Sequence, residues 1–137
     1  MLFRSETSLI IRLSNLIRPL MRFLFPKMNE KDKEYKEITL NIIANLLGIG
    51  NAATPLGLKA MKTMQEKNTK KDTVTDSMAM FIVLNTASLQ IIPTTVIAVR
   101  ASMGSENPAQ IILPVWIVTI ITDITGIVAS KILMKKF

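Results

Sequence analysis

The chain has 137 residues, a length that fits a single domain. It contains neither cysteine nor histidine, which excludes disulfide scaffolds, zinc sites with sulfur or imidazole ligands, and Ser-His-Asp triads. Its net charge of +7 suits nucleic acid or anionic lipid, but only 5% of the residues are aromatic and no nucleic-acid-binding motif is present. Membrane lipid is therefore the expected partner, and nucleic acid is not.

Uncharged runs dominate the rest of the sequence. Residues 38–58 and 77–99 contain no Asp, Glu, Lys or Arg, and residues 107–130 contain only Asp123. A helix of about 20 such residues can cross the hydrocarbon core of a bilayer. Because a soluble domain of this size does not need two such runs, the sequence favours a membrane protein over a soluble enzyme.

Residues 1–26 are predicted to form a basic amphipathic helix, with most leucines on one half and Arg18 and Arg22 on the other. Pro19 predicts a kink within it. Such a helix can lie in the membrane interface or pack on the other helices, and amphipathicity alone does not separate these alternatives. Residues 27–37 read as a polar, solvated connector.

Residues 38–58 predict a broken helix. The first piece is expected to end near Leu47, followed by a break at GIGNAA, residues 48–53. A second helix is expected to begin at Pro55 with Thr54 as its N-cap. GIGNAA also matches a dinucleotide-binding pattern, but that pattern needs a preceding strand and a parallel sheet, so this interpretation is rejected.

Two further helices are predicted after a Lys-rich loop. The TVTD sequence at residues 73–76 resembles a capping box, so the next helix is expected from about Val74, with a break around Pro93. Asn107 is expected to cap the last helix and Pro108 to begin it.

The distribution of positive charge predicts the topology. Loop 59–72 contains five Lys and the C-terminus three, whereas loop 100–107 contains only Arg100. The Lys-rich side should be cytoplasmic, and the basic N-terminal residues should lie there too. Residues 38–58 must then enter and leave the membrane on the same side, as a re-entrant hairpin. A kinked span is the alternative if the N-terminal helix does not follow the charge rule.

A short internal repeat suggests a polar site. Asn51-Ala-Ala-Thr54 is similar to Asn85-Thr86-Ala-Ser88, and each lies in an apolar segment followed by a proline. Paired interrupted segments are typical of ligand sites in transporters. The alternative is that these side chains only join helix to helix by hydrogen bonds. Asp123 is a further candidate, because a carboxylate in a membrane segment is costly; Arg100 is a possible partner.

The stretches NLLGIGNAATPLGLKAM (residues 45–61) and LNTASLQIIPTTVIAVRASMGSENPAQI (residues 84–111) resemble the spore maturation protein A family, as does RPLMRFLFP (residues 18–26). This family is part of a nucleoside-recognition, or Gate, group. The resemblance implies an integral membrane protein of endospore-forming bacteria that acts with spore maturation protein B in dehydration of the spore core. Family members usually have further apolar segments first, so this chain is expected to be a C-terminal portion or a shortened member.

Together these observations predict a single Gate-like domain over residues 1–137. Its expected fold is an all-α membrane protein with an amphipathic interfacial helix, a re-entrant broken helix and two transmembrane helices, one of them kinked. The candidate cavity residues are Asn51, Thr54, Asn85, Thr86, Ser88 and Asp123, and the expected structural breaks are Gly48, Gly50, Pro55 and Pro93.

The expected function is the gating or transport of a small polar solute in the cell membrane, with a protein B-like partner or a second copy. The alternative is a non-transporting structural or assembly subunit. No enzymatic activity, metal or cofactor is expected, since no catalytic constellation is visible.

Overall fold

The computed structural model describes residues 2–87 and 90–136, with side chains from residue 8 onwards. The described residues form helices and no strand, which confirms the all-α prediction. The elements are α1 (Leu2–Leu24), α2 (Lys33–Leu46), α3 (Gly50–Lys67), α4 (Asp76–Ala87), α5 (Thr94–Ser102), the short 3-10 helix η1 (Pro108–Ile111) and α6 (Ile112–Lys136).

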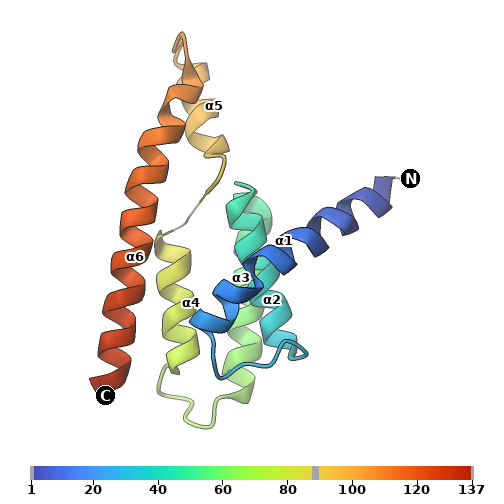
Figure 1. Ribbon diagram of the computed structural model, residues 1–137, viewed down its shortest axis with the longest axis vertical. Helices are drawn as coiled ribbons and strands as arrows, with labels where there is room; N and C mark the ends of the chain where they lie inside the picture. Colours follow the sequence, from blue (N-terminus) through green and yellow to red (C-terminus); the bar gives the residue numbers. More distant parts are fainter. Residues whose placement is uncertain (1, 88–89, 137) are drawn as a thin grey trace.

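Helices α2 and α3 form an antiparallel hairpin, as Figure 1 shows. The break predicted at residues 48–53 is shorter than expected, because α2 ends at Leu46 and α3 already begins at Gly50, which is therefore helical. Gly48, between the two helices, has a φ of +70°, a left-handed conformation that favours glycine. The predicted start of the second helix was wrong, because α3 begins at Gly50 and includes Pro55. Thr54 is therefore not an N-cap, and its hydroxyl instead donates to the carbonyl oxygen of Gly50 at 3.3 Å.

The early start of α3 has a local cause. The amides of Ala52 and Ala53 both donate to the carbonyl oxygen of Ile49 at 3.0 Å, which forms the first helical turn before the proline is reached. Pro55 is the sixth residue of α3, where its missing N–H removes one helical hydrogen bond without ending the helix. Pro55 is thus not a structural break.

The break around Pro93 is confirmed, because α4 ends at Ala87 and α5 begins at Thr94. The start of α4 differs from the prediction. Thr75 caps it through a hydroxyl that accepts from the Met78 amide at 3.3 Å. Thr73 lies in the preceding loop, where its carbonyl oxygen accepts from the Asn68 side chain at 2.7 Å.

The segment after the break lies against the tip of the α2–α3 hairpin. The amide of Ile91 donates to the carbonyl oxygen of Leu46 at 2.8 Å, and the hydroxyl of Thr94 donates to that of Gly48 at 2.8 Å. The indole N–H of Trp116 on α6 donates to the carbonyl oxygen of Ile91, also at 2.8 Å. Backbone groups freed by a helix break need protein partners in an apolar setting, and these bonds supply some of them.

One described helix is long and apolar enough to cross a membrane. It covers residues 108–136 with a mean hydropathy of 2.2 in its most apolar window, none of which is buried inside the protein. The second expected span is divided into α4, with 12 residues, and α5, with 9 residues. At about 1.5 Å per residue neither piece alone reaches the roughly 30 Å of a hydrocarbon core. The described part of the chain thus has one continuous candidate span rather than two.

The entry into this long helix largely follows the prediction. Pro108 begins η1, which continues into α6, and Asn107 occupies the N-cap position. The Asn107 side chain makes no capping hydrogen bond. Proline suits this position because its fixed φ fits a helix and its missing N–H has no intrahelical acceptor there.

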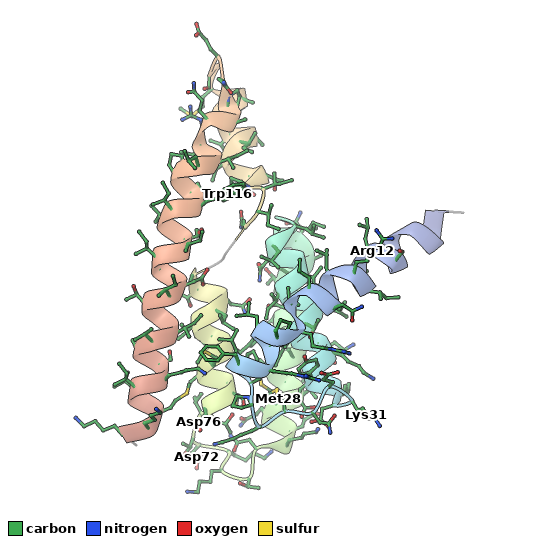
Figure 2. The ribbon with its side chains drawn as sticks, viewed as in Figure 1. Arg12, Met28, Lys31, Asp72, Asp76 and Trp116 are labelled. Carbon is green, nitrogen blue, oxygen red and sulfur yellow. The ribbon has the colours of Figure 1, made fainter. Side chains whose placement is uncertain are left out.

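Helix α1 packs on the other helices only at its C-terminal end. Ile17, Met21 and Leu24 are buried there, and Arg18 and Arg22 both form ion pairs with Glu30. The N-terminal part projects away from the other helices, as Figures 1 and 2 show, and carries the exposed Arg12. Pro19 lies inside α1, which is one helix from end to end.

The polar connector is less solvated than predicted, because α2 begins within it and buries Glu34 and Glu37. Lys67 on α3 donates to the Glu34 carboxylate at 2.7 Å, and Lys59 lies 3.6 Å from that of Glu37. The hydrogen bond with Glu34 raises the pKa of Lys67 above its usual value, although this lysine is exposed. The lysines on α3 offset part of the cost of burying these carboxylates, of which both Glu37 oxygens and one Glu34 oxygen are buried without a hydrogen bond.

Candidate functional site

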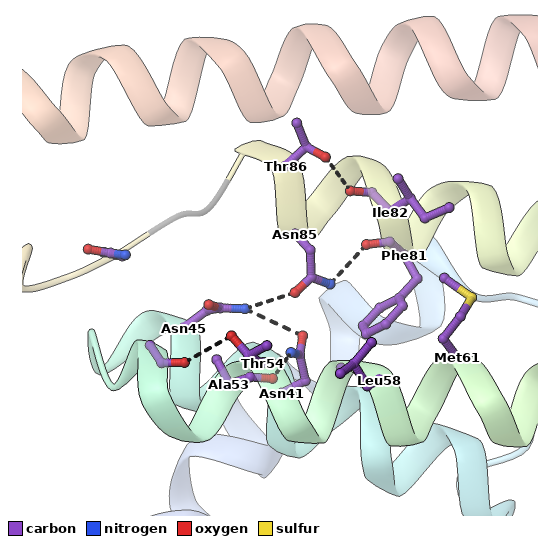
Figure 3. A pocket seen from close by; sticks show the side chains of 13 residues that line it. Asn41, Asn45, Ala53, Thr54, Leu58, Met61, Phe81, Ile82, Asn85 and Thr86 are labelled. Carbon is purple, nitrogen blue, oxygen red and sulfur yellow. Dashed lines mark hydrogen bonds between the residues drawn. The ribbon is translucent and has the colours of Figure 1, made fainter.

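A cavity of about 490 Å³ lies between the α2–α3 hairpin and α4, close to the break after α4 (Figure 3). Its apolar lining includes Leu58, Met61 and Phe81. Polar side chains interrupt this surface at six positions, namely Asn41, Asn45, Thr54, Asn85, Thr86 and Gln90. An apolar cavity with a few polar groups is the usual form of a small-molecule site.

Three asparagines form a hydrogen-bonded cluster at one wall of this cavity. The Asn45 side-chain amide donates to the side-chain oxygens of Asn85 at 3.1 Å and of Asn41 at 3.4 Å. Asn41 donates in turn to the carbonyl oxygen of Ala53 at 2.8 Å, and Asn85 to that of Phe81 at 2.9 Å. Two of these four bonds join α2 to α3 and to α4, and the other two lie within α2 and α4 and fix the asparagine orientations. The Asn45 side-chain oxygen has no donor among the described residues.

Close packing at this wall depends on Gly57 of α3. A Cβ atom at this position would lie 2.9 Å from the side-chain nitrogen of Asn41, a separation that real Cβ atoms do not tolerate without a shift of the neighbour. A small residue here lets α3 approach α2 closely enough for Asn41 to reach the Ala53 carbonyl oxygen.

The structure brings only part of the predicted site together. Thr54, Asn85 and Thr86 line the cavity. Asn51 does not line it and is exposed on the first turn of α3, because the helix begins before this residue rather than after it. Ser88 lies outside the described residues.

Sequence reasoning missed Asn41 and Asn45, although a signal was present. The two asparagines are four residues apart in an otherwise apolar run, so they share one face of α2. Asparagine in such a run needs a hydrogen-bond partner. That pair is enough to predict a polar contact with another helix, but it does not identify which helix.

Asp123 lies on the other side of the asparagine cluster. It lines a separate cavity of about 230 Å³, which is mainly apolar but also includes Asn41, Asn45 and Asn85. One Asp123 carboxylate oxygen is buried and has no hydrogen-bond partner. The suggested partner Arg100 instead donates to the hydroxyl of Ser105 at 3.2 Å. The asparagines therefore line both cavities, with Asp123 in one and Thr54 and Thr86 in the other.

Two chemical alternatives find no support in this geometry. Across the described residues, no three His, Cys, Asp or Glu side chains are grouped closely enough to hold a metal ion. The GIGNAA sequence follows a helix rather than a strand, so it lacks the surroundings of a dinucleotide-binding turn.

The fold combines a helix that is long and apolar enough to cross a membrane with a cavity, partly lined by polar side chains, beside a broken helix. No protein-family model and no solved structure matches the chain. It is 37% identical over 126 residues to spore maturation protein A of Bacillus subtilis (strain 168), an alignment that covers 92% of this chain. Over nearly its whole length the chain is therefore similar to spore maturation protein A, which supports the family resemblance seen in the sequence. It spans 64% of the length of that relative.

Proposed function

We propose that this chain is an integral membrane protein of sporulation that gates or transports a small polar solute during dehydration of the spore core. It acts with a partner membrane protein, similar to spore maturation protein B, or with a second copy of itself. The family relationship supports the sporulation role, and the long apolar helix supports the membrane location. We propose no enzymatic activity.

The asparagine-lined cavity carries the transport proposal. Asn41, Asn45 and Asn85 come from apolar helices, where an amide side chain without a partner is costly. Their cluster leaves the Asn45 side-chain oxygen available, and Thr54 and Thr86 add hydroxyl groups to the same cavity. Such a surface suits an uncharged solute with several hydrogen-bonding groups. The helix break next to it, between α4 and α5, is typical of transporter sites.

We expect Asn45→Ala to reduce solute flux at least about tenfold, since removing one hydrogen-bonding group at a buried polar site costs roughly 1–3 kcal/mol. Flux and ligand-dependent thermal stabilisation are measured after reconstitution with the presumed partner, using a panel of small polar solutes. Asn85→Ala should behave similarly. Asn51→Ala is the matched control, because Asn51 lies nearby but does not line the cavity, and it should leave flux unchanged.

The alternative function is a non-transporting subunit whose broken helices bind another membrane protein. It is favoured if the wild-type complex is stable and stoichiometric but gives no flux and no ligand stabilisation. In that case Asn45→Ala should change only the assembly of the complex.

We propose that both termini and the loop after α3 are cytoplasmic. Introducing a cysteine at Thr69, which is exposed in this loop, should give a protein that reacts with a membrane-impermeant maleimide only after the cells are opened. Glu106→Cys, exposed in the loop before η1, should react in intact cells. The chain has no cysteine of its own, so the background is low. Labelling of the Thr69 variant from outside would contradict this orientation.

A further inference from the structure

A third cavity, of about 380 Å³, lies where the C-terminal ends of α1 and α6 meet the start of α4. Its interior is apolar and its edge is charged. The apolar lining comes from Leu24, Pro26, Met80 and Met134, and the polar lining from Lys27, Asp76, Ser77, Lys131 and Lys135. It is separate from the asparagine-lined cavity and shares no residue with it.

The charge of this cavity is positive, because it has three lysines and one aspartate. Lys27 forms an ion pair with Asp76 at 2.9 Å, which neutralises the only acidic group of the lining. Lys131 donates to the carbonyl oxygen of Phe23 at 2.7 Å and lies 3.4 Å from the centre of its ring. Neither contact removes the charge of Lys131. Lys135 is exposed and forms no ion pair within the described residues.

The position of the cavity matters as much as its charge. It lies at the C-terminal end of the candidate membrane span, where Lys131, Lys135 and Lys136 follow the apolar residues. If α6 spans the membrane, it leaves the hydrocarbon core at this end. The cavity would then face the lipid headgroups on the Lys-rich side. Lysines at this depth attract anionic lipid on the cytoplasmic leaflet.

We infer that this cavity binds the headgroup phosphate of an anionic phospholipid such as phosphatidylglycerol. Lys131 and Lys135 supply the charge for the phosphate, Ser77 supplies a hydroxyl donor, and the glycerol and upper acyl region contact Leu24, Met80 and Met134. A soluble anion would not need this apolar interior, and a neutral lipid would not need the lysines. The inference rests on the proposed membrane placement of α6 but not on solute transport.

The test measures binding of phosphatidylglycerol to the purified 137-residue chain by native mass spectrometry, with phosphatidylcholine as the neutral comparison. Lys135→Glu should weaken phosphatidylglycerol binding about tenfold or more, because it removes a positive charge beside the phosphate and adds a negative one. Lys136→Glu is the matched control. It makes the same charge change on the adjacent residue, which does not line the cavity, and should change binding less than about threefold.

Three outcomes would overturn the inference. Equal losses in the two variants would indicate diffuse attraction rather than a site, and equal binding of phosphatidylcholine would exclude charge recognition. Competition by free glycerol 3-phosphate as effective as that by the lipid would identify a soluble anion instead. Circular dichroism of each variant checks that the helices are retained. The cysteine-labelling experiment reports separately on membrane placement.

Discussion

Gly48→Ala is expected to destabilise the protein by roughly 3 kcal/mol. Gly48 has a φ of +70°, which alone costs a residue with a Cβ atom about 1 kcal/mol or more. The added Cβ would also overlap the carbonyl oxygen of Ile92 and come within 3.2 Å of the Thr94 hydroxyl. Since a backbone oxygen cannot turn away as a side chain can, the tip of the hairpin must separate from the segment that follows α4.

Substitutions at two other glycines separate the cost of the positive φ from the cost of the steric overlap. Gly104 also has a positive φ, of +78°, but a Cβ there meets nothing within 4 Å, so Gly104→Ala should show the conformational cost alone, about 1 kcal/mol. Gly50 has neither problem, and Gly50→Ala should be neutral or slightly stabilising within α3. Unfolding in detergent, followed by circular dichroism, gives the three values. Equal losses for Gly48→Ala and Gly104→Ala would contradict the proposed contact.

Asp123→Leu is expected to stabilise the protein by about 2 kcal/mol, against the usual direction of point mutations. One oxygen of this carboxylate is buried without a hydrogen-bond partner, and most neighbours in its cavity are apolar. Leucine removes the desolvated polar group, and the cavity of about 230 Å³ has room for the larger side chain. The midpoint of thermal unfolding in detergent and in lipid nanodiscs measures the effect.

Thr122→Leu is the matched control for Asp123, because Thr122 is exposed on the same helix and bonds only to the carbonyl oxygen of Val118. Its effect should stay within about 0.5 kcal/mol. Destabilisation by Asp123→Leu would instead mean that the carboxylate has a partner in the assembled protein. Stabilisation with loss of solute flux would assign Asp123 to function rather than to folding.

The helix breaks were predictable because their causes are local. Gly48 supplies the left-handed conformation of the turn, and Pro93 prevents α4 and α5 from joining as one regular helix. The exact helix starts were not predictable in the same way. Whether Thr54 or Ile49 precedes α3, and whether Thr73 or Thr75 caps α4, depends on which of two neighbouring turns forms, and the residue pattern allows either.

The sequence predicted the type of residue that lines the cavity, but not which individual residues line it. Polar residues in apolar segments indicated Thr54 and Asn85, which line the cavity, yet the same reasoning included Asn51, which is exposed and does not line it. The bond between Asn45 and Asn85 could not be predicted, because these residues are 40 positions apart and meet only where α2 packs against α4. The buried Glu34 was likewise hidden in a charged stretch, since the partner Lys67 comes from the far end of α3.

The contacts of Ile91 connect three parts of the molecule in series. Its amide bonds to Leu46 at the tip of the hairpin, and its carbonyl oxygen bonds to Trp116 on α6. A displacement of the hairpin tip that keeps both bonds must therefore move Trp116 and the long helix with it, and one that breaks them leaves the Ile91 amide or carbonyl oxygen without this partner. The hairpin tip and α6 are thus mechanically coupled through the backbone of Ile91, so an opening at the broken helix would also displace the candidate membrane span.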